Sequence, residues 1–155
     1  DLGSVARVPV EPADHLDWTS YLPESLTSLN LIGSGTKIPP SWKKRLSTLS
    51  NLRHLSIRWP LPDCSAPPDF IRYLPSSLVS FSANFNEQPP TEDLTVLPRG
   101  LISFVAFWSR TTQPIHFVPL LDLLPPHLGF ISVPSSSRAT GVAEAKAKGI
   151  SIHFS

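Results

Sequence analysis

A short motif, Leu-Pro-x-x-Leu, occurs four times in this 155-residue chain, and each copy is followed by the same apolar spacing. Apolar residues stand three and five positions after the last leucine of the motif. The four segments with this pattern are 22–31, 74–83, 97–106 and 124–133. Such recurrence is typical of chains whose units stack side by side, because a single unit cannot bury its own leucines.

A fifth unit fills the gap between the first two copies. Leu52, Leu55 and Ile57 have the same spacing and lie midway between Leu26 and Leu78. Two degenerate copies are predicted at the ends of the chain, with apolar residues aligned at the same three positions. They are Val5, Val8 and Val10 before the first clear unit, and Ala147, Ile150 and Ile152 after the last.

Segment 78–86, Leu-Val-Ser-Phe-Ser-Ala-Asn-Phe-Asn, matches the pattern L-x-x-L-x-L-x-x-N, and the chain resembles the leucine-rich-repeat superfamily. The other units replace the pattern's asparagine with Ser34, Pro60, Ser109 and Ser136, and an irregular turn is expected at Pro60. The resemblance implies an α/β fold, a horseshoe solenoid with a parallel sheet on its concave face and short helices on its convex face.

The residues themselves favour the same alternation of elements. A spacing of two between apolar residues predicts a short strand in each unit, and proline-led segments with apolar steps of three and four predict helices between the strands. The predicted helices cover 40–49, 68–74, 90–97 and 143–148, and a last strand is predicted at 150–154. The helix residues expected to face the sheet are Trp42, Leu46, Leu49, Phe70, Tyr73 and Leu74.

The chain is predicted to form a single leucine-rich-repeat domain over 1–155, with clear repeats at about 22–134 and degenerate repeats at 1–21 and 135–155. It begins with Asp1 and contains no methionine, which favours a piece of a longer chain that carries further repeats or domains.

Composition argues against several classes of partner. Thirteen Lys and Arg residues against 12 Asp and Glu residues give a net charge of +1, which disfavours nucleic acid and anionic membranes as partners. The nearly apolar run 115–124 is too short to span a bilayer. Cys64 is the only cysteine and is interpreted as a loop residue, and no Asn-x-Ser/Thr site occurs. These features favour a cytoplasmic location and leave secretion open.

No motif argues for catalysis, a metal or another cofactor. Gly33-Ser34-Gly35-Thr36-Lys37 lacks the spacing of a phosphate-binding loop and is interpreted as a turn. The basic run 43–45 is interpreted as a solvated helix face, and the five histidines have no metal-site spacing. Four tryptophans could anchor an interface, although Trp42 is better explained as core. The others are Trp18, Trp59 and Trp108.

The most informative functional prediction concerns the strand residues that alternate out of the core. Small polar side chains flanked by a few large ones would let a partner's backbone approach closely, as at interface hot spots. A face that is merely solvated, or covered by other parts of the same protein, is the alternative. The predicted partner-binding residues are Asn30, Ile32, His54, Ser56, Arg58, Ser80, Ser82, Asn84, Ser103, Val105, Phe107 and Phe130.

Three functions remain open from the sequence. The first is a non-catalytic module that recognises a protein or peptide ligand on the concave face. The second is a structural spacer that contacts its neighbours in a larger assembly. The third is the substrate-binding arm of an enzyme such as a ubiquitin ligase, with catalysis outside this segment. Fold alone distinguishes none of the three.

Overall fold

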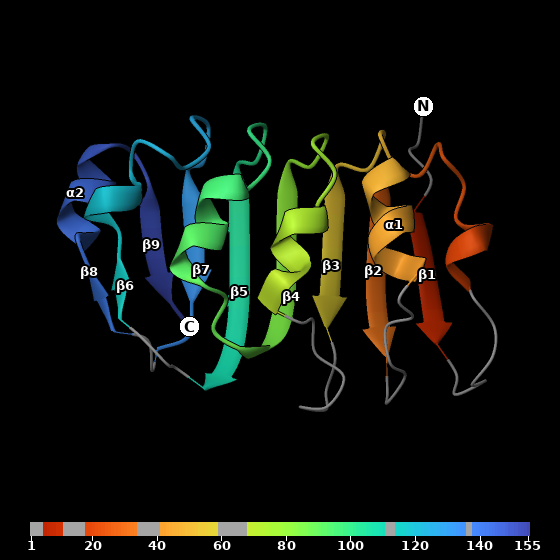
Figure 1. Cartoon of the computed structure of the whole chain (residues 1–155), viewed down its shortest axis with the longest axis horizontal. Helices are drawn as coiled ribbons and strands as arrows, with labels where there is room; N and C mark the ends of the chain where they lie inside the picture. The colour runs from red at the N-terminus through yellow and green to blue at the C-terminus, as the bar shows by residue number, and fades with distance from the viewer. Residues whose placement is uncertain (1–4, 11–17, 34–40, 59–67, 111–113, 136–137) are drawn as a thin grey trace.

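The computed structural model describes residues 5–10, 18–33, 41–58, 68–110, 114–135 and 138–155. In these ranges the chain is an α/β protein with one seven-stranded sheet, and every pair of neighbouring strands is parallel. Short helices lie on one face of the sheet (Figure 1). The strands, in their order across the sheet, are β1 (Val5–Val10), β2 (Ser28–Gly33), β3 (His54–Arg58), β4 (Ser80–Glu87), β5 (Ser103–Arg110), β7 (Phe130–Val133) and β9 (Ser151–Phe154).

The connections between the strands contain short helices and one small additional sheet. Strands β6 (Ile115–His116) and β8 (Ala139–Thr140) pair in parallel with each other. None of the described helices is long and apolar enough to cross a membrane. The helices are α1 (Ser41–Thr48) and α2 (Val142–Ala147), together with the 3-10 helices η1 (Trp18–Tyr21), η3 (Pro68–Tyr73), η4 (Thr91–Val96) and η5 (Val118–Leu120).

The register of the central strands matches the alignment of the five sequence segments. Leu29 lies beside Leu55, and the row continues through Phe81, Phe104 and Ile131. All five side chains are buried, as their alternation predicts. Positions aligned from the sequence in these five units are therefore confirmed as neighbours in the sheet.

The predicted alignment of both terminal units is wrong, in each case by one full period of the strand alternation. Val8 lies beside Leu31 rather than beside Leu29, and Ile152 lies beside Ile131 rather than beside Val133. Such a shift keeps the same side chains on the core face, because successive strand residues alternate between the faces. Alternation alone therefore does not distinguish the two registers, and main-chain pairing with the neighbouring strand selects one of them.

The Leu-Pro-x-x-Leu motif forms the same turn in each of its four copies. The proline carbonyl accepts a hydrogen bond from the N–H of the second leucine, with N···O distances of 2.9 to 3.1 Å. A proline at the start of such a turn also ends the preceding helical segment. The four donor–acceptor pairs are Leu26 with Pro23, Leu78 with Pro75, Leu101 with Pro98, and Leu128 with Pro125.

The turns are joined by hydrogen bonds that repeat from one strand connection to the next. In the first three copies of the motif, the carbonyl of the residue after the second leucine accepts N–H bonds from two consecutive residues of the next unit, and in the fourth copy Gly129 accepts one from Ser151. Thr27 accepts from Arg53 and His54, and Ile102 accepts from Gly129 and Phe130. These bonds satisfy main-chain groups at the point where the strands begin, so they hold the units in parallel register.

The helical segments are confirmed in part. In α1, Trp42 and Leu46 are buried in the core, as predicted. Leu49, immediately after the helix, is buried as well. The segments at 68–74 and 90–97 form 3-10 helices, which suit short connections. The predicted inward position of Tyr73 is wrong, because η3 ends there and the Tyr73 ring is exposed beneath the ammonium group of Lys43, 4.9 Å from its centroid.

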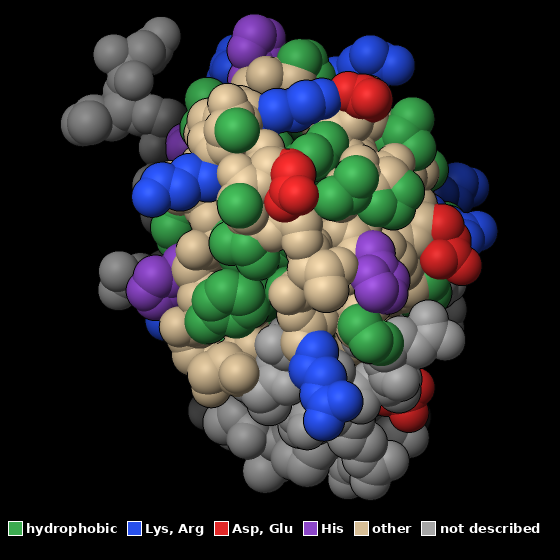
Figure 2. Space-filling view, turned by 90° about the vertical axis from the view of Figure 1, so that its left-hand side faces the viewer, with side chains coloured by type: hydrophobic (Ala, Val, Ile, Leu, Met, Phe, Trp, Pro, Cys, Tyr) green, Lys and Arg blue, Asp and Glu red, His purple; other side chains and the backbone are tan. Residues whose placement is uncertain are grey.

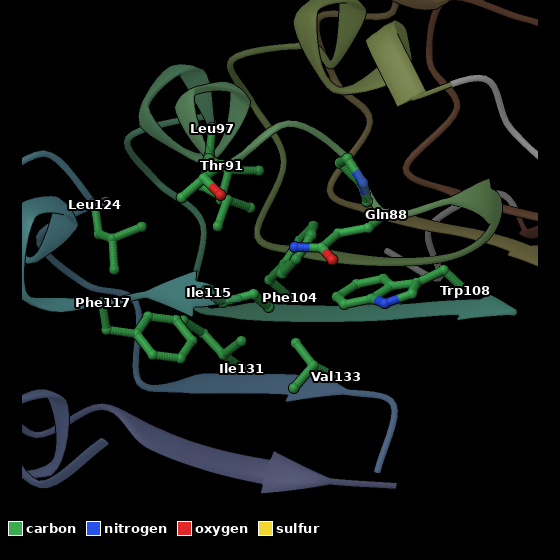
Figure 3. A pocket seen from close by; sticks show the side chains of 12 residues that line it. Gln88, Thr91, Leu97, Phe104, Trp108, Ile115, Phe117, Leu124, Ile131 and Val133 are labelled. Carbon is green, nitrogen blue, oxygen red and sulfur yellow. The ribbon is translucent and has the colours of Figure 1, made fainter. Parts of the chain in front are cut away.

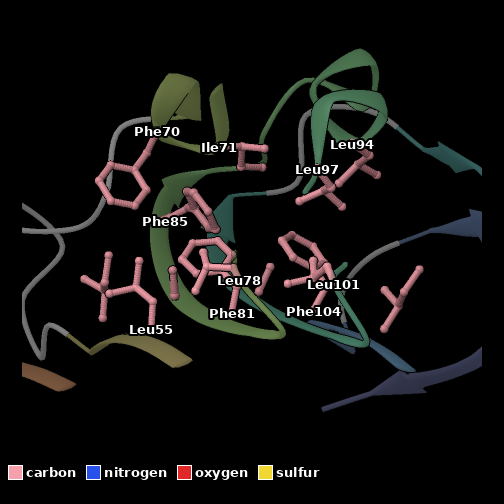
Figure 4. Close-up of a cluster of buried hydrophobic side chains, with 14 of the residues drawn as sticks. Leu55, Phe70, Ile71, Leu78, Phe81, Phe85, Leu94, Leu97, Leu101 and Phe104 are labelled. Atoms are coloured by element: carbon pink, nitrogen blue, oxygen red, sulfur yellow. The ribbon is translucent and has the colours of Figure 1, made fainter. Parts of the chain in front are cut away.

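The centre of the core is a run of aromatic rings between the helices and the sheet (Figure 4). The Trp42 and Phe70 rings stack at 6.3 Å, and Phe70 continues to Phe81 at 6.2 Å. Phe81 also contacts Phe104, with ring centroids 5.9 Å apart, and Phe85 at 6.3 Å. The rings come from α1, η3, β4 and β5, so they join elements distant in the sequence.

Some sequence predictions fall outside the residues or side chains that the structure describes. They are the turn at Ser34 to Lys37, the loop with Trp59, Pro60 and Cys64, the residue Ser136, and the side chains of Trp18, Asn86 and Ser109.

Glycine is required at Gly141, immediately before α2. Its φ is +78°, and a Cβ there would lie 2.7 Å from Cγ2 and 2.9 Å from the main-chain nitrogen of Val118. We expect Gly141→Ala to lower the free energy of unfolding by about 2–3 kcal/mol, because backbone strain and a steric clash add. Urea denaturation measures this value.

Substitutions at two other glycines show how much of the expected loss at Gly141 comes from backbone strain and how much from the steric clash with Val118. Gly149 also has a positive φ, of +82°, but a Cβ there meets nothing within 4 Å, so Gly149→Ala is expected to cost only about 1 kcal/mol. Gly129 is equally open and has no positive φ, so Gly129→Ala is expected to be nearly neutral. Equal losses for Gly141→Ala and Gly149→Ala would contradict a clash with Val118.

Candidate functional site

The face of the sheet opposite the helices carries the predicted partner-binding residues, and it is called the open face below (Figure 1). Its side chains come from alternate strand positions and form three rows across the strands. The first row contains Ser28, His54, Ser80, Ser103, Phe130 and Ser151. The second row contains Asn30, Ser56, Ser82, Val105, Ser132 and His153. The third row contains Ile32, Arg58, Asn84 and Phe107.

The centre of the open face is built from serines. Ser56, Ser80, Ser82 and Ser103 belong to three neighbouring strands, and all four are half-buried. Neighbouring strands in a sheet are roughly 4.8 Å apart, so these hydroxyl groups form one continuous polar patch. Side chains of this size would let a partner's backbone come close to the strands, and partner binding here stays a prediction.

Larger groups flank the serines on both sides. His54 and Arg58 on β3 are exposed, and the half-buried Phe107 on β5 belongs to the third row. At the far end Phe130 stacks on His153 of β9, with ring centroids 6.3 Å apart and planes inclined by 25°. Arg58 and His54 therefore lie on the β3 side of the serine patch, and the rings of Phe107, Phe130 and His153 lie on its β5 side.

Two polar atoms of the second row are buried without a hydrogen-bond partner among the described residues. They are Oδ1 of Asn30 and Oγ of Ser82, on strands β2 and β4. A buried polar atom that lacks a partner costs free energy, and an approaching donor would recover part of it. Because both atoms are buried, a donor from outside could reach them only after a local rearrangement of the side chains.

By their main-chain register, Ile32, Ser132 and His153 lie on the same face of the sheet as the central serines. Ile32 lies in the third row by its main-chain register, and its side chain is outside what the structure describes. Ser132 is buried, and its hydroxyl donates to Oγ of Ser155 at 3.2 Å. His153 belongs to the face by its pairing with Ser132, and it is missing from the predicted set because that set includes no residue of the degenerate last unit. The shift of two positions in the predicted register does not change the face on which His153 lies.

A small cavity lies inside the core, away from the open face (Figure 3). It is lined almost entirely by apolar side chains, including Phe104, Ile115 and Phe117, and Nε1 of Trp108 is buried there without a hydrogen-bond partner among the described residues. The cavity measures about 10 Å³, close to the roughly 10–15 Å³ that one water needs. It is a packing gap too small for an organic ligand, and Trp108 is core rather than an interface anchor.

Other candidate motifs have structural roles in the described residues. Arg45 of the basic run donates to the carbonyl of Leu22 and approaches Glu24 at 3.8 Å, so only part of that run is a solvated face. In the ranges that the structure covers, no group of three or more His, Cys, Asp or Glu side chains is arranged to hold a metal ion.

Comparison with protein-family models, with curated proteins and with solved structures gives no significant match for this chain. The geometry of the chain itself therefore supplies the basis for a functional proposal.

Proposed function

We propose that this chain is a leucine-rich-repeat horseshoe solenoid that binds an acidic peptide segment of a partner protein on its open, concave face, without catalysis. The observation that carries the proposal is the serine patch on the three neighbouring strands β3, β4 and β5, with Arg58 in the adjacent row on β3 and Phe107 in the same row on β5. The chain-order stacking of parallel strands and the identical turns support the solenoid assignment.

The charge of the open face favours an acidic ligand. Arg58 is cationic, and the imidazole rings of His54 and His153 can donate hydrogen bonds. The three rows contain no Asp or Glu. Carboxylates of a partner would pair with these groups, and oppositely charged surfaces favour both encounter and correct orientation. Phe107 and Phe130 would contact apolar side chains of the same segment, as aromatic anchors do in other interfaces.

A displayed library of random peptides, selected on the immobilised chain, tests this function. We expect the selected peptides to be richer in Asp and Glu than the starting library. Arg58→Glu should weaken their binding at least tenfold, because a like charge then faces the ligand's carboxylates. Fluorescence anisotropy with labelled peptides gives the dissociation constants.

Lys44→Glu is the matched control, because it makes the same change in net charge at an exposed position of α1 on the helix side. It should leave the affinity within about twofold, since exposed charges farther apart than about 8–10 Å are largely screened at physiological salt. Equal losses for Arg58→Glu and Lys44→Glu, or selected peptides without acidic enrichment, would reject the open face as the binding site.

A further inference from the structure

The sheet has two edge strands in the described chain, and they differ in chemistry. Strand β9 is bonded to β7 on one side, and no described strand pairs with its other side. Figure 2 looks onto this end of the molecule, where hydrophobic side chains lie at the surface between charged ones. The unpaired edge of β9 is called the β9 edge below.

Main-chain hydrogen-bonding groups point outward along the β9 edge. The N–H groups of Ser151 and Ser155 donate to the carbonyls of Gly129 and Val133, at 2.9 Å each. In a parallel ladder alternate residues bond to opposite neighbours, so the main-chain groups of Ile152 and Phe154 point away from β7. This edge therefore offers donors and acceptors in the geometry that an additional parallel strand uses.

Side chains at the same edge lack the cover that their counterparts have. Ile131 is 2% exposed, but Ile152, its neighbour in the core-facing row, is only half-buried. Val133 is 2% exposed, whereas its neighbour Phe154 is 41% exposed. A further strand with apolar residues two positions apart would continue both rows and remove this apolar surface from water.

The opposite edge disfavours a second copy of the chain as that strand. By the same alternation the main-chain groups of Val5, Arg7 and Pro9 in β1 point away from β2. Pro9 has no N–H, so a β1 strand placed against the β9 edge would leave one of the ladder's bonds unmade. Proline at an edge position is a common protection against strand pairing, and the β9 edge has none.

We propose that the β9 edge is a second interaction site, which binds an extended segment of a partner protein as an added parallel strand. The segment is recognised by main-chain hydrogen bonds to Ile152 and Phe154, and by two apolar side chains that alternate with small polar ones. This site is separate from the open face and does not depend on the function proposed for it.

A short synthetic peptide in which isoleucine and valine alternate with serine is the probe. Titrated into the isotope-labelled chain, it should give saturable NMR shifts of the Ile152 and Phe154 amides. The same peptide with N-methylated serines should bind at least tenfold more weakly, because those nitrogens face the β9 edge in the added strand. Equal binding of the methylated peptide would overturn strand addition.

Ile152→Pro removes an outward N–H without removing a bond to β7, and it should weaken the peptide at least tenfold. Phe154→Pro gives a second test if the first variant fails to fold. Arg58→Glu should leave the affinity for this peptide unchanged, which separates the β9 edge from the open face. Concentration-dependent self-association in sedimentation that Ile152→Pro abolishes would identify a second copy as the occupant and overturn the proposal.

Discussion

Phe81→Ala is expected to lower the free energy of unfolding by about 3–5 kcal/mol, a loss that would unfold a large part of a marginally stable domain. Phe81 has no exposed surface, and its ring contacts Phe70, Phe85 and Phe104. Removal of the ring leaves a cavity at the junction of β4, β5 and η3, which the surrounding rings cannot fill without leaving their packed positions. Denaturation in guanidinium chloride, followed by circular dichroism, measures the loss.

Phe107→Ala is the matched control, because it removes the same side chain from the neighbouring strand on the open face. Phe107 is half-buried, and its loss should cost about 1 kcal/mol. Similar losses for the two variants would show that the core does not lie on the helix side of the sheet. The pair therefore tests which face of the sheet carries the stability.

Arg72→Ala is expected to destabilise the chain by about 2–3 kcal/mol, because it leaves the carboxylate of Asp93 buried without its cation. Asp93 is 3% exposed, and its Oδ1 accepts from Nε of Arg72 at 2.8 Å and lies 2.7 Å from Nη2. The pair joins η3 to η4 across the helix side of the sheet. Thermal and urea denaturation measure the change.

A double-mutant cycle separates this ion pair from general packing. Arg72→Met combined with Asp93→Leu replaces both charges with apolar groups, so no buried charge remains without a partner. The double variant should be more stable than Arg72→Ala alone. The cycle compares the double variant with Arg72→Met alone and Asp93→Leu alone. If the stability losses of these two single variants add up to the loss of the double variant, the two side chains act independently, contrary to their geometry.

The sequence was sufficient to predict the central strands and their partners. Leu29, Leu55, Phe81, Phe104 and Ile131 were aligned from spacing alone, and they form one row across the sheet. The Leu-Pro-x-x-Leu motif fixes where β2, β4, β5 and β7 begin, because each of these strands begins two residues after the second leucine of the turn. Where the motif occurs, its second leucine gives a fixed position from which the register of neighbouring strands can be predicted.

The open face followed from the same alignment. Once the buried positions at +3 and +5 were assigned, period-two alternation placed Ser56, Ser82 and Phe107 on the other face of their strands. The same alignment did not predict the side-chain contacts on the open face. The burial of Ser132 and the unpartnered atoms of Asn30 and Ser82 depend on neighbouring strands, which no single segment specifies.

In the two terminal units, the predicted strand register had no such reference position. Neither terminal unit contains Leu-Pro-x-x-Leu, and registers that differ by one period of the alternation bury equally apolar side chains. The predicted partner-binding set includes no residue of either terminal unit, so His153 was left out of it. The sequence also did not predict which helical segments are 3-10 helices. In so short a connection, the choice between 3-10 and α geometry depends on the distance that the segment spans between two strands.

Local spacing of leucine and proline thus determined which residues are buried and where the central strands pair, because turn chemistry and alternation act within one unit. Tertiary structure alone decided the register of the terminal strands, the Arg72–Asp93 pair and the unpaired β9 edge. Each of these depends on contacts between neighbouring units, and the free energy of such contacts is set only when the neighbouring strand is in place.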